Sequence, residues 1–166
     1  MANVAHEYTV VALVQDRPGV LNRVSSMFRR RGYNIVSLAV GHSEKVGLSR
    51  MTFVVDCDDA TIDQVRKQLD KLIEVIEVTD MTELASVTRE LALIKVASSP
   101  ETRSEIIQLV DIFRANIVDV TADSVIIEVT GDENKVDSLL TLLEDYGIVE
   151  IMRTGRIAIP RGMATP

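Results

Sequence analysis

The sequence predicts an α+β protein made of two ferredoxin-like domains in tandem. Three observations indicate this fold class. Apolar runs typical of strands alternate with helical stripes, each half of the chain gives the order βαββαβ, and 166 residues suffice for two small domains. We expect each domain to be an antiparallel sheet with helices on one face. The predicted domains are residues 1–82 and 83–166, joined near the polar stretch TELASVTREL that starts at Thr82.

The strands of the first half are marked by β-branched runs that end in turns. Residues 8–15 form the first such run, and residues 35–41 and 48–56 flank the polar turn HSEKVG. This spacing predicts a hairpin. Residues 75–81 complete the predicted sheet.

Two helices of the first half are predicted by apolar residues at helical spacing. Gly32 should end the first helix, whose last turn holds three arginines that complement the helix dipole. Thr61 or Asp59 is the expected cap of the second. The expected inward residues are Val20, Leu21, Val24, Met27 and Phe28 in the first helix, and Ile62, Val65, Leu69, Leu72 and Ile73 in the second.

The second half repeats this order of elements. Strands are predicted at residues 91–98, at 117–121 and 125–130 around a turn at Ala122-Asp123, and within 148–159. The inward helical residues are Ile106, Ile107, Val110 and Phe113, then Val136, Leu139, Leu140 and Leu143. Short echoes, FRRRGYNIV and FRANIV, support an internal repeat.

Composition narrows the class of protein. The net charge is −7 and the pI is near 4.9, which argues against nucleic acid or anionic lipid as the main partner. The single cysteine fits a reducing compartment. The N-terminus MANVAHEYTV has no positive region followed by an apolar block, so we expect no signal peptide. No apolar run approaches the roughly 20 residues of a spanning helix. We therefore expect a soluble, cytoplasmic protein that does not bind membranes.

Catalytic and metal motifs are missing from the sequence. His6 and His42 have no metal-ligand spacing with Cys57, and acidic neighbours should raise the pKa of that thiol. The carboxylates of Asp56, Asp58 and Asp59 are typical of a solvated turn. Neither GxGxxG nor GxxxxGK[ST] occurs. We expect no catalytic site, metal or cofactor on this chain.

The joint Asp16-Arg17-Pro18-Gly19, between the first strand and the first helix, is the most informative motif. Pro18 suits a first helical turn, Asp16 can shape the turn, and Gly19 leaves the backbone bare. The N–H groups of Gly19, Val20 and Leu21 would suit a carboxylate. Asp16 would hold an ammonium group, and the Asn34 amide can donate and accept. The site would fit a free amino acid; the alternative is a plain tight turn.

This region also resembles a known family. DRPGVLNRVSSMFRRRGYNI resembles the ligand-binding turn of ACT domains. RRGYNIVSLAVG followed by LSRMTFVV resembles the small, regulatory subunit of acetolactate synthase (acetohydroxyacid synthase). RELALIKV and FRANIVDVT are similar to the C-terminal domain of that subunit. The resemblance covers nearly the whole chain in order.

The resemblance implies a regulatory subunit that associates with a large catalytic subunit carrying thiamine diphosphate, Mg²⁺ and FAD. That enzyme condenses two pyruvates to acetolactate in branched-chain amino-acid biosynthesis. The small subunit raises its activity and confers feedback inhibition by valine, or by leucine or isoleucine. The effector sites lie between two ACT domains of a homodimer. The effector-binding residues implied here are Asp16, Gly19, Val20, Leu21, Asn34 and Ile35.

Two departures from the family pattern affect these expectations. Some relatives have asparagine where this chain has Asp16, so a negative charge is added beside the effector. The equivalent joint of the second half, residues 98–102, lacks the glycine, and we expect no effector site there. The rival functions are a free-standing ACT-type amino-acid sensor acting in transcription, which would need a DNA-binding element, and a small enzyme working unaided.

Overall fold

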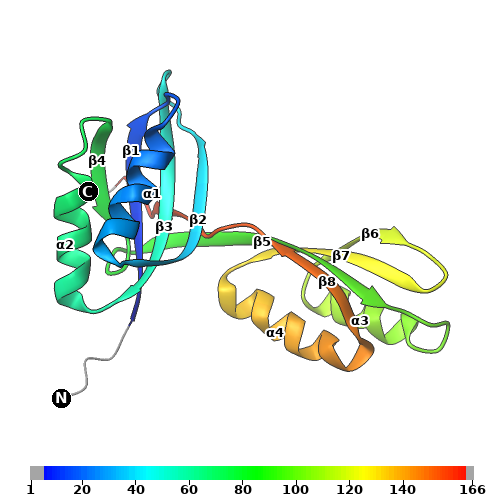
Figure 1. Cartoon of the computed structure of the whole chain (residues 1–166). Coiled ribbons are helices and arrows are strands. Elements are labelled where there is room, and N and C mark those ends of the chain that lie inside the picture. The colour runs from blue at the N-terminus through cyan, green and yellow to red at the C-terminus, as the bar shows by residue number, and fades with distance from the viewer. Residues whose placement is uncertain (1–5, 164–166) are drawn as a thin grey trace, which may run out of the picture. The chain divides into compact units, whose positions relative to one another are not determined.

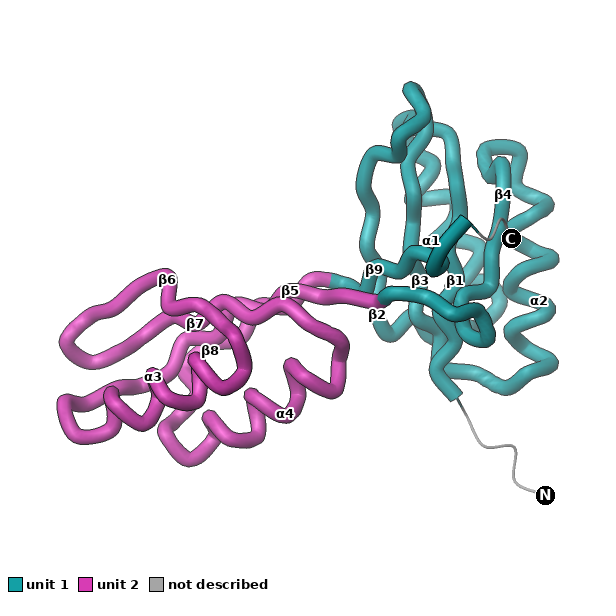
Figure 2. Tube along the Cα trace, turned by 180° about the vertical axis from the view of Figure 1, so that it is seen from behind, with its two compact units in different colours: residues 1–87, 155–166 teal, residues 88–154 magenta. Residues whose placement is uncertain are grey.

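The structure is a computed structural model in which the chain forms two compact units (Figures 1 and 2). Unit 1 contains Met1–Val87 together with Gly155–Pro166, and unit 2 contains Thr88–Thr154. The structure describes residues 6–163. The first predicted domain therefore begins, and the second ends, outside the described residues. The first five residues of the N-terminus, where we expect no signal peptide, also lie outside them.

Unit 1 is a four-stranded antiparallel sheet with two helices. Its strand order is β2-β3-β1-β4. The elements are β1 (His6–Gln15), α1 (Val20–Arg31), β2 (Asn34–His42), β3 (Leu48–Cys57), α2 (Asp59–Leu69) and β4 (Val75–Asp80). Gly32, with φ +70°, ends α1 as predicted, and all three arginines lie in its last turn. The predicted hairpin is β2–β3.

The core of unit 1 lies between one face of the sheet and the two helices. Alternate residues of β1, Val10, Ala12 and Val14, are buried there. From the helices, the buried residues are Val20, Val24, Met27, Phe28, Ile62, Val65 and Leu69. Two predictions were wrong: Leu21 is 44% exposed and Ile73 is 85% exposed. Ile73 is exposed because it follows the end of α2. Leu21 lies in α1 beside the buried residues, which form a narrower stripe than the apolar residues of the sequence.

Unit 2 repeats this plan. Its sheet has the order β6-β7-β5-β8. β9 (Ile157–Pro160) belongs to unit 1 and pairs with β5, which begins in unit 1 at Ser86. The elements are β5 (Ser86–Ala97), α3 (Arg103–Ile112), β6 (Asn116–Val120), β7 (Ser124–Gly131), α4 (Glu133–Leu143), a 3₁₀ turn (Glu144–Tyr146) and β8 (Ile148–Arg153). The helices bury Ile106, Val110, Val136, Leu139 and Leu143. Leu140 and Phe113 are half-buried, but Ile107 is 40% exposed and its prediction was wrong.

The short sequence echo corresponds to a shared structural feature. Asn34 and Asn116 each begin the second strand of their unit. In both strands the register shifts at the same place, between Ile35 and Ser37 and between Ile117 and Asp119. The two units therefore share a β-bulge as well as an order of elements, and the predicted fold class, two βαββαβ units, is confirmed.

The division of the chain differs from the predicted ranges 1–82 and 83–166. Unit 1 extends to Val87, and it also includes the segment that begins at Gly155. The polar stretch expected to join the domains is partly strand, since β5 starts at Ser86. Unit 2 is thus inserted between two parts of unit 1, as the colours of Figure 2 show.

Candidate functional site

The joint between β1 and α1 is built around a left-handed glycine. Gly19 precedes α1 with φ +87° and ψ −9°, a conformation that side chains with a Cβ rarely adopt. An added Cβ would meet nothing within 4 Å, so the space beside the backbone is open. Sequence reasoning predicted the bare backbone here but missed the positive φ, which only the geometry of the turn reveals.

The start of α1 has no side chain capping it. No side-chain hydrogen bond caps the helix, and its first turn contains no acidic residue. The Val20 N–H is not fully free as predicted, because it lies 3.4 Å from the carbonyl oxygen of Arg17, a long hydrogen bond. At Gly19 and at the exposed Leu21, in contrast, the backbone N–H groups lie at the positive end of the helix dipole with no side chain capping them, so this end of α1 is suited to an anion.

Asp16 takes a different role from the one predicted within the turn. Its carboxylate pairs with His42, with Oδ2 3.2 Å from Nδ1, and the Asp16 N–H donates to the carbonyl oxygen of Gly47 at 2.8 Å. Within residues 6–163 the carboxylate makes no hydrogen bond to the following backbone. Asp16 thus links the joint to the β2–β3 hairpin rather than capping α1.

The structure separates the predicted effector residues into two groups. Asn34 and Glu7 are both paired with Asp56 of β3, so Asn34 lies level with the start of β1. Gly19 instead follows the end of β1. The length of β1 places these groups about 25 Å apart within one chain. Asn34 is exposed and Ile35 is half-buried against the core. One copy therefore brings together Asp16, Gly19, Val20 and Leu21, but not Asn34 and Ile35.

The corresponding joint of unit 2 is occupied by its own side chains. The Ser99 N–H donates to Thr102 Oγ1 at 3.0 Å, and the Thr102 N–H donates to Ser99 Oγ at 3.3 Å. Arg103 closes the turn by donating to the carbonyl oxygens of Thr121 and Ala122. The helix start in unit 2 is thus tied into local hydrogen bonds that the joint in unit 1 lacks.

Cys57 has an unreactive environment. Burial and the charges of Asp58, Asp56, Asp59 and Asp80 raise the pKa of the thiol to about 11. The sequence predicted the effect of the acidic neighbours, while burial, the largest cause, became visible only in the structure. Between residues 6 and 163 no group of three or more His, Cys, Asp or Glu side chains is placed to hold a metal ion.

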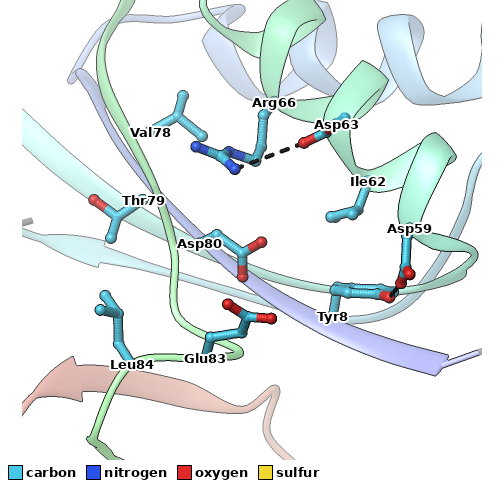
Figure 3. Close-up of a pocket in the computed structure, with 10 residues that line it drawn as sticks. All are labelled: Tyr8, Asp59, Ile62, Asp63, Arg66, Val78, Thr79, Asp80, Glu83 and Leu84. Atoms are coloured by element: carbon cyan, nitrogen blue, oxygen red, sulfur yellow. Dashed lines mark hydrogen bonds and ion pairs between the residues drawn. The ribbon is translucent and has the colours of Figure 1, made fainter.

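A pocket of about 600 Å³ lies elsewhere in unit 1, between α2 and β4 (Figure 3). Tyr8 and Arg66 line this pocket together with four carboxylates, those of Asp59, Asp63, Asp80 and Glu83. The Tyr8 hydroxyl donates to Asp59, and this bond raises the pKa of Tyr8 to about 12. None of the predicted effector residues lines this pocket, and its negative charge does not suit the carboxylate of an amino acid.

Comparison with known proteins decides the family. The family model "Small subunit of acetolactate synthase" matches residues 89–162, and "AHAS small subunit-like ACT domain" matches residues 11–77. The probable acetolactate synthase small subunit of Archaeoglobus fulgidus is 56% identical over 156 residues, 94% of this chain and 98% of the relative. The chain belongs to the family of acetolactate synthase small subunits.

Other small subunits extend this likeness to nearly the full length. That of Bacillus subtilis is 50% identical over 154 residues, 92% of this chain and 90% of the relative. The crystal structure of the Thermotoga maritima small subunit is 46% identical, with a TM-score of 0.88 over 96% of this chain and 99% of that one. Unit 1 therefore contains the ACT domain of a small subunit. In residues 6–163 no helix is long and apolar enough to cross a membrane.

Proposed function

We propose that this small subunit is regulatory: it activates the catalytic large subunit of acetolactate synthase and makes it sensitive to valine. Its family membership supports a partnership with that subunit. The chain is proposed to have no catalytic site or cofactor of its own. Thiamine diphosphate, Mg²⁺ and FAD are expected on the large subunit, which condenses two pyruvates to acetolactate.

Valine is proposed to bind at the open joint before α1, residues 16–19. A carboxylate would accept hydrogen bonds from backbone N–H groups at Gly19 and Leu21, where no side chain competes. Asp16 is close enough to the joint to attract an ammonium group, although His42 shares its carboxylate. The ligand would then be a small apolar amino acid with an uncharged, branched side chain, such as valine.

The separation of the two groups of residues favours a site shared by two copies. β2 is an edge strand of unit 1, so its free side can pair with β2 of a second copy. An antiparallel pair centred on Leu38 would set Asn34 of the second copy opposite His42, which contacts Asp16 at the joint. Asn34 and Ile35 of one copy would then complete the site of the other. This proposed homodimer places two effector sites symmetrically.

The proposed regulation is thermodynamic linkage. Valine can shift the complex between states only if it binds one state more tightly than the other. A site built from two copies provides such a difference, because valine favours the arrangement in which both halves meet. That arrangement would no longer support the active conformation of the large subunit.

Thermal unfolding with L-valine tests ligand binding directly. A ligand that binds only the folded chain raises the unfolding midpoint once its concentration exceeds Kd. We expect L-valine to raise the midpoint and L-lysine to leave it unchanged. The absence of a shift with valine, leucine and isoleucine, both for this chain alone and for its complex with the large subunit, would contradict an amino-acid site.

Gly19→Asp tests the location of the site. The new carboxylate would stand where that of the effector binds, so valine inhibition should be lost while activation of the large subunit is retained. Because φ is +87° at Gly19, Gly19→Asn is the matched control: asparagine tolerates this conformation and adds no charge. Acetolactate formation with and without valine is the measurement. Unchanged valine inhibition in Gly19→Asp would rule out the joint as the binding site.

A further inference from the structure

The segment that returns from unit 2 to unit 1 is held on the middle of β2. An added Cβ at Gly155 would lie 2.9 Å from Ala39 N and closer still to the carbonyl group of Leu38. Gly155 therefore rests directly on the Leu38–Ala39 peptide, where only a residue without a Cβ fits. These two residues lie at the centre of the β2 pairing proposed above.

Arg156 extends this anchor across the sheet. Its N–H donates to Ser37 Oγ at 2.9 Å, directly after the β-bulge that follows Ile35. Its guanidinium donates to Thr9 Oγ1 and to Glu7 Oε2, each at 3.1 Å. The Arg156 side chain is 17% exposed and Thr9 is buried, so these contacts are largely shielded from water.

The residues just before this anchor are held equally firmly inside unit 2. Arg153 pairs with Glu90 and, at 2.7 Å, with Asp137. Thr154 and Leu91 exchange two hydrogen bonds, Thr154 N–H to the Leu91 carbonyl at 2.9 Å and Leu91 N–H to Thr154 Oγ1 at 3.0 Å. From Arg153 to Arg156, four consecutive residues are each fixed by contacts within their own unit.

We propose that Gly155 and Arg156 are the coupling element that transmits the effector state of unit 1 to unit 2. This inference rests on the proposed function. Pairing of β2 with a second copy, or a change in that pairing on effector binding, would alter the backbone at Ser37–Ala39. Gly155 and Arg156 contact this part of β2, and the residues directly before them, Arg153 and Thr154, are bonded within unit 2. A change in the β2 backbone would therefore reach unit 2 through these four residues. Gly155 and Arg156 are positioning residues and do not touch the effector.

Two variants loosen the anchor in different ways. Gly155→Ala adds the Cβ that collides with the β2 backbone, and Gly155 has no positive φ to confuse the result. Arg156→Met keeps the length of the side chain but removes its bonds to Glu7 and Thr9. Arg89→Met is the matched control, since the exposed Arg89 donates to the carbonyl oxygen of its neighbour Thr88. Arg156→Lys should restore part of the coupling by keeping the positive charge near Glu7.

The experiment uses the full chain reconstituted with the large subunit. L-valine binding is measured by calorimetry and valine inhibition by acetolactate formation. In Gly155→Ala and Arg156→Met, we expect valine to bind as in the unmodified chain. At saturating valine, the acetolactate-forming activity that remains should rise at least about fivefold, the lower end of ordinary coupling factors. Arg89→Met should match the unmodified chain in both measurements.

The outcomes separate the inference from the proposed function. If the unmodified chain neither binds valine nor confers inhibition, the proposed function fails and this inference fails with it. If the unmodified chain responds but both variants remain fully inhibited, only the coupling role is wrong. Loss of valine binding in both variants, with retained circular dichroism, would show that the anchor shapes the binding site itself and would also overturn coupling.

Discussion

Gly19 combines a backbone requirement with a chemical one. Its φ of +87° turns the chain from β1 into α1, and its missing Cβ leaves the first helical donors accessible. From the sequence, Asp16-Arg17-Pro18-Gly19 already predicted a strand-to-helix joint with room for a ligand. The pairing of Asp16 with His42 was unpredictable, because it depends on the register that brings the end of β2 beside the joint.

The pKa of Cys57 leads to a prediction at the same scale. With the pKa at about 11 instead of an ordinary 9, the thiolate fraction at pH 8 falls about 100-fold. The higher nucleophilicity of the more basic thiolate recovers roughly tenfold. We expect iodoacetamide to modify Cys57 in the folded chain about tenfold more slowly than in the urea-unfolded chain at pH 8, with the rate rising up to pH 11.

Mass spectrometry of the quenched reaction gives both rates. Folded and unfolded rates that agree at pH 8 would show that burial and the neighbouring carboxylates leave the thiol unaffected. Since the folded pKa is raised, the thiol stabilises the fold below pH 9, and this contribution is lost as the pH rises from about 9 to 11.

At the scale of the element, the ends of the helices show what local sequence can decide. Helix α2 begins after Asp58, whose carboxylate accepts the Thr61 N–H at 2.7 Å. The sequence predicted a cap among the neighbouring residues, Thr61 or Asp59, and missed the correct one by one position. Asp58, Asp59 and Thr61 all satisfy the preference for a cap, and only the backbone conformation at Asp58, extended with φ −93° and ψ 168°, selects among them.

Replacement of this cap should weaken unit 1. Asp58→Ala removes the side-chain acceptor of the Thr61 N–H, which keeps only the carbonyl oxygen of residue 58 at 3.0 Å, and we expect the free energy of unfolding to fall by about 1 kcal/mol. Asp58→Asn, which keeps an acceptor oxygen, is the matched control and should lose much less. Urea denaturation of both variants measures the difference. Equal stability of Asp58→Ala and the unmodified chain would show that the cap contributes nothing.

At the scale of the whole molecule, the order of elements was predictable and the division of the chain was not. Periodicity identified the strands and helices of both halves, since each side chain faces the core or solvent within its own unit. Nothing local to Gly155 or Arg156 reveals that their partners are Leu38, Ser37 and Glu7, over 100 residues earlier. Likewise, the separation of Asn34 from Gly19 follows from strand register and not from spacing in the sequence.

Removal of residues 155–166 tests this division. The shortened chain loses the Arg156 bonds to Glu7, Thr9 and Ser37, all in unit 1. We expect amide hydrogen exchange in β1 and β2 to accelerate by on the order of tenfold, while α4 in unit 2 exchanges as before. Hydrogen exchange read by mass spectrometry resolves these elements. Equal acceleration in both units, or none in β1 and β2, would contradict the assignment of the segment to unit 1.

The insertion of unit 2 within unit 1 also sets an order of events during synthesis. A ribosome delivers the chain from its N-terminus, and domains of most proteins complete their folding in that order. Here Gly155 and Arg156 are made after β8, the last element of unit 2. Unit 2 can therefore finish folding before Gly155 and Arg156 contact β1 and β2, and unit 1 gains these contacts only after unit 2 has been made.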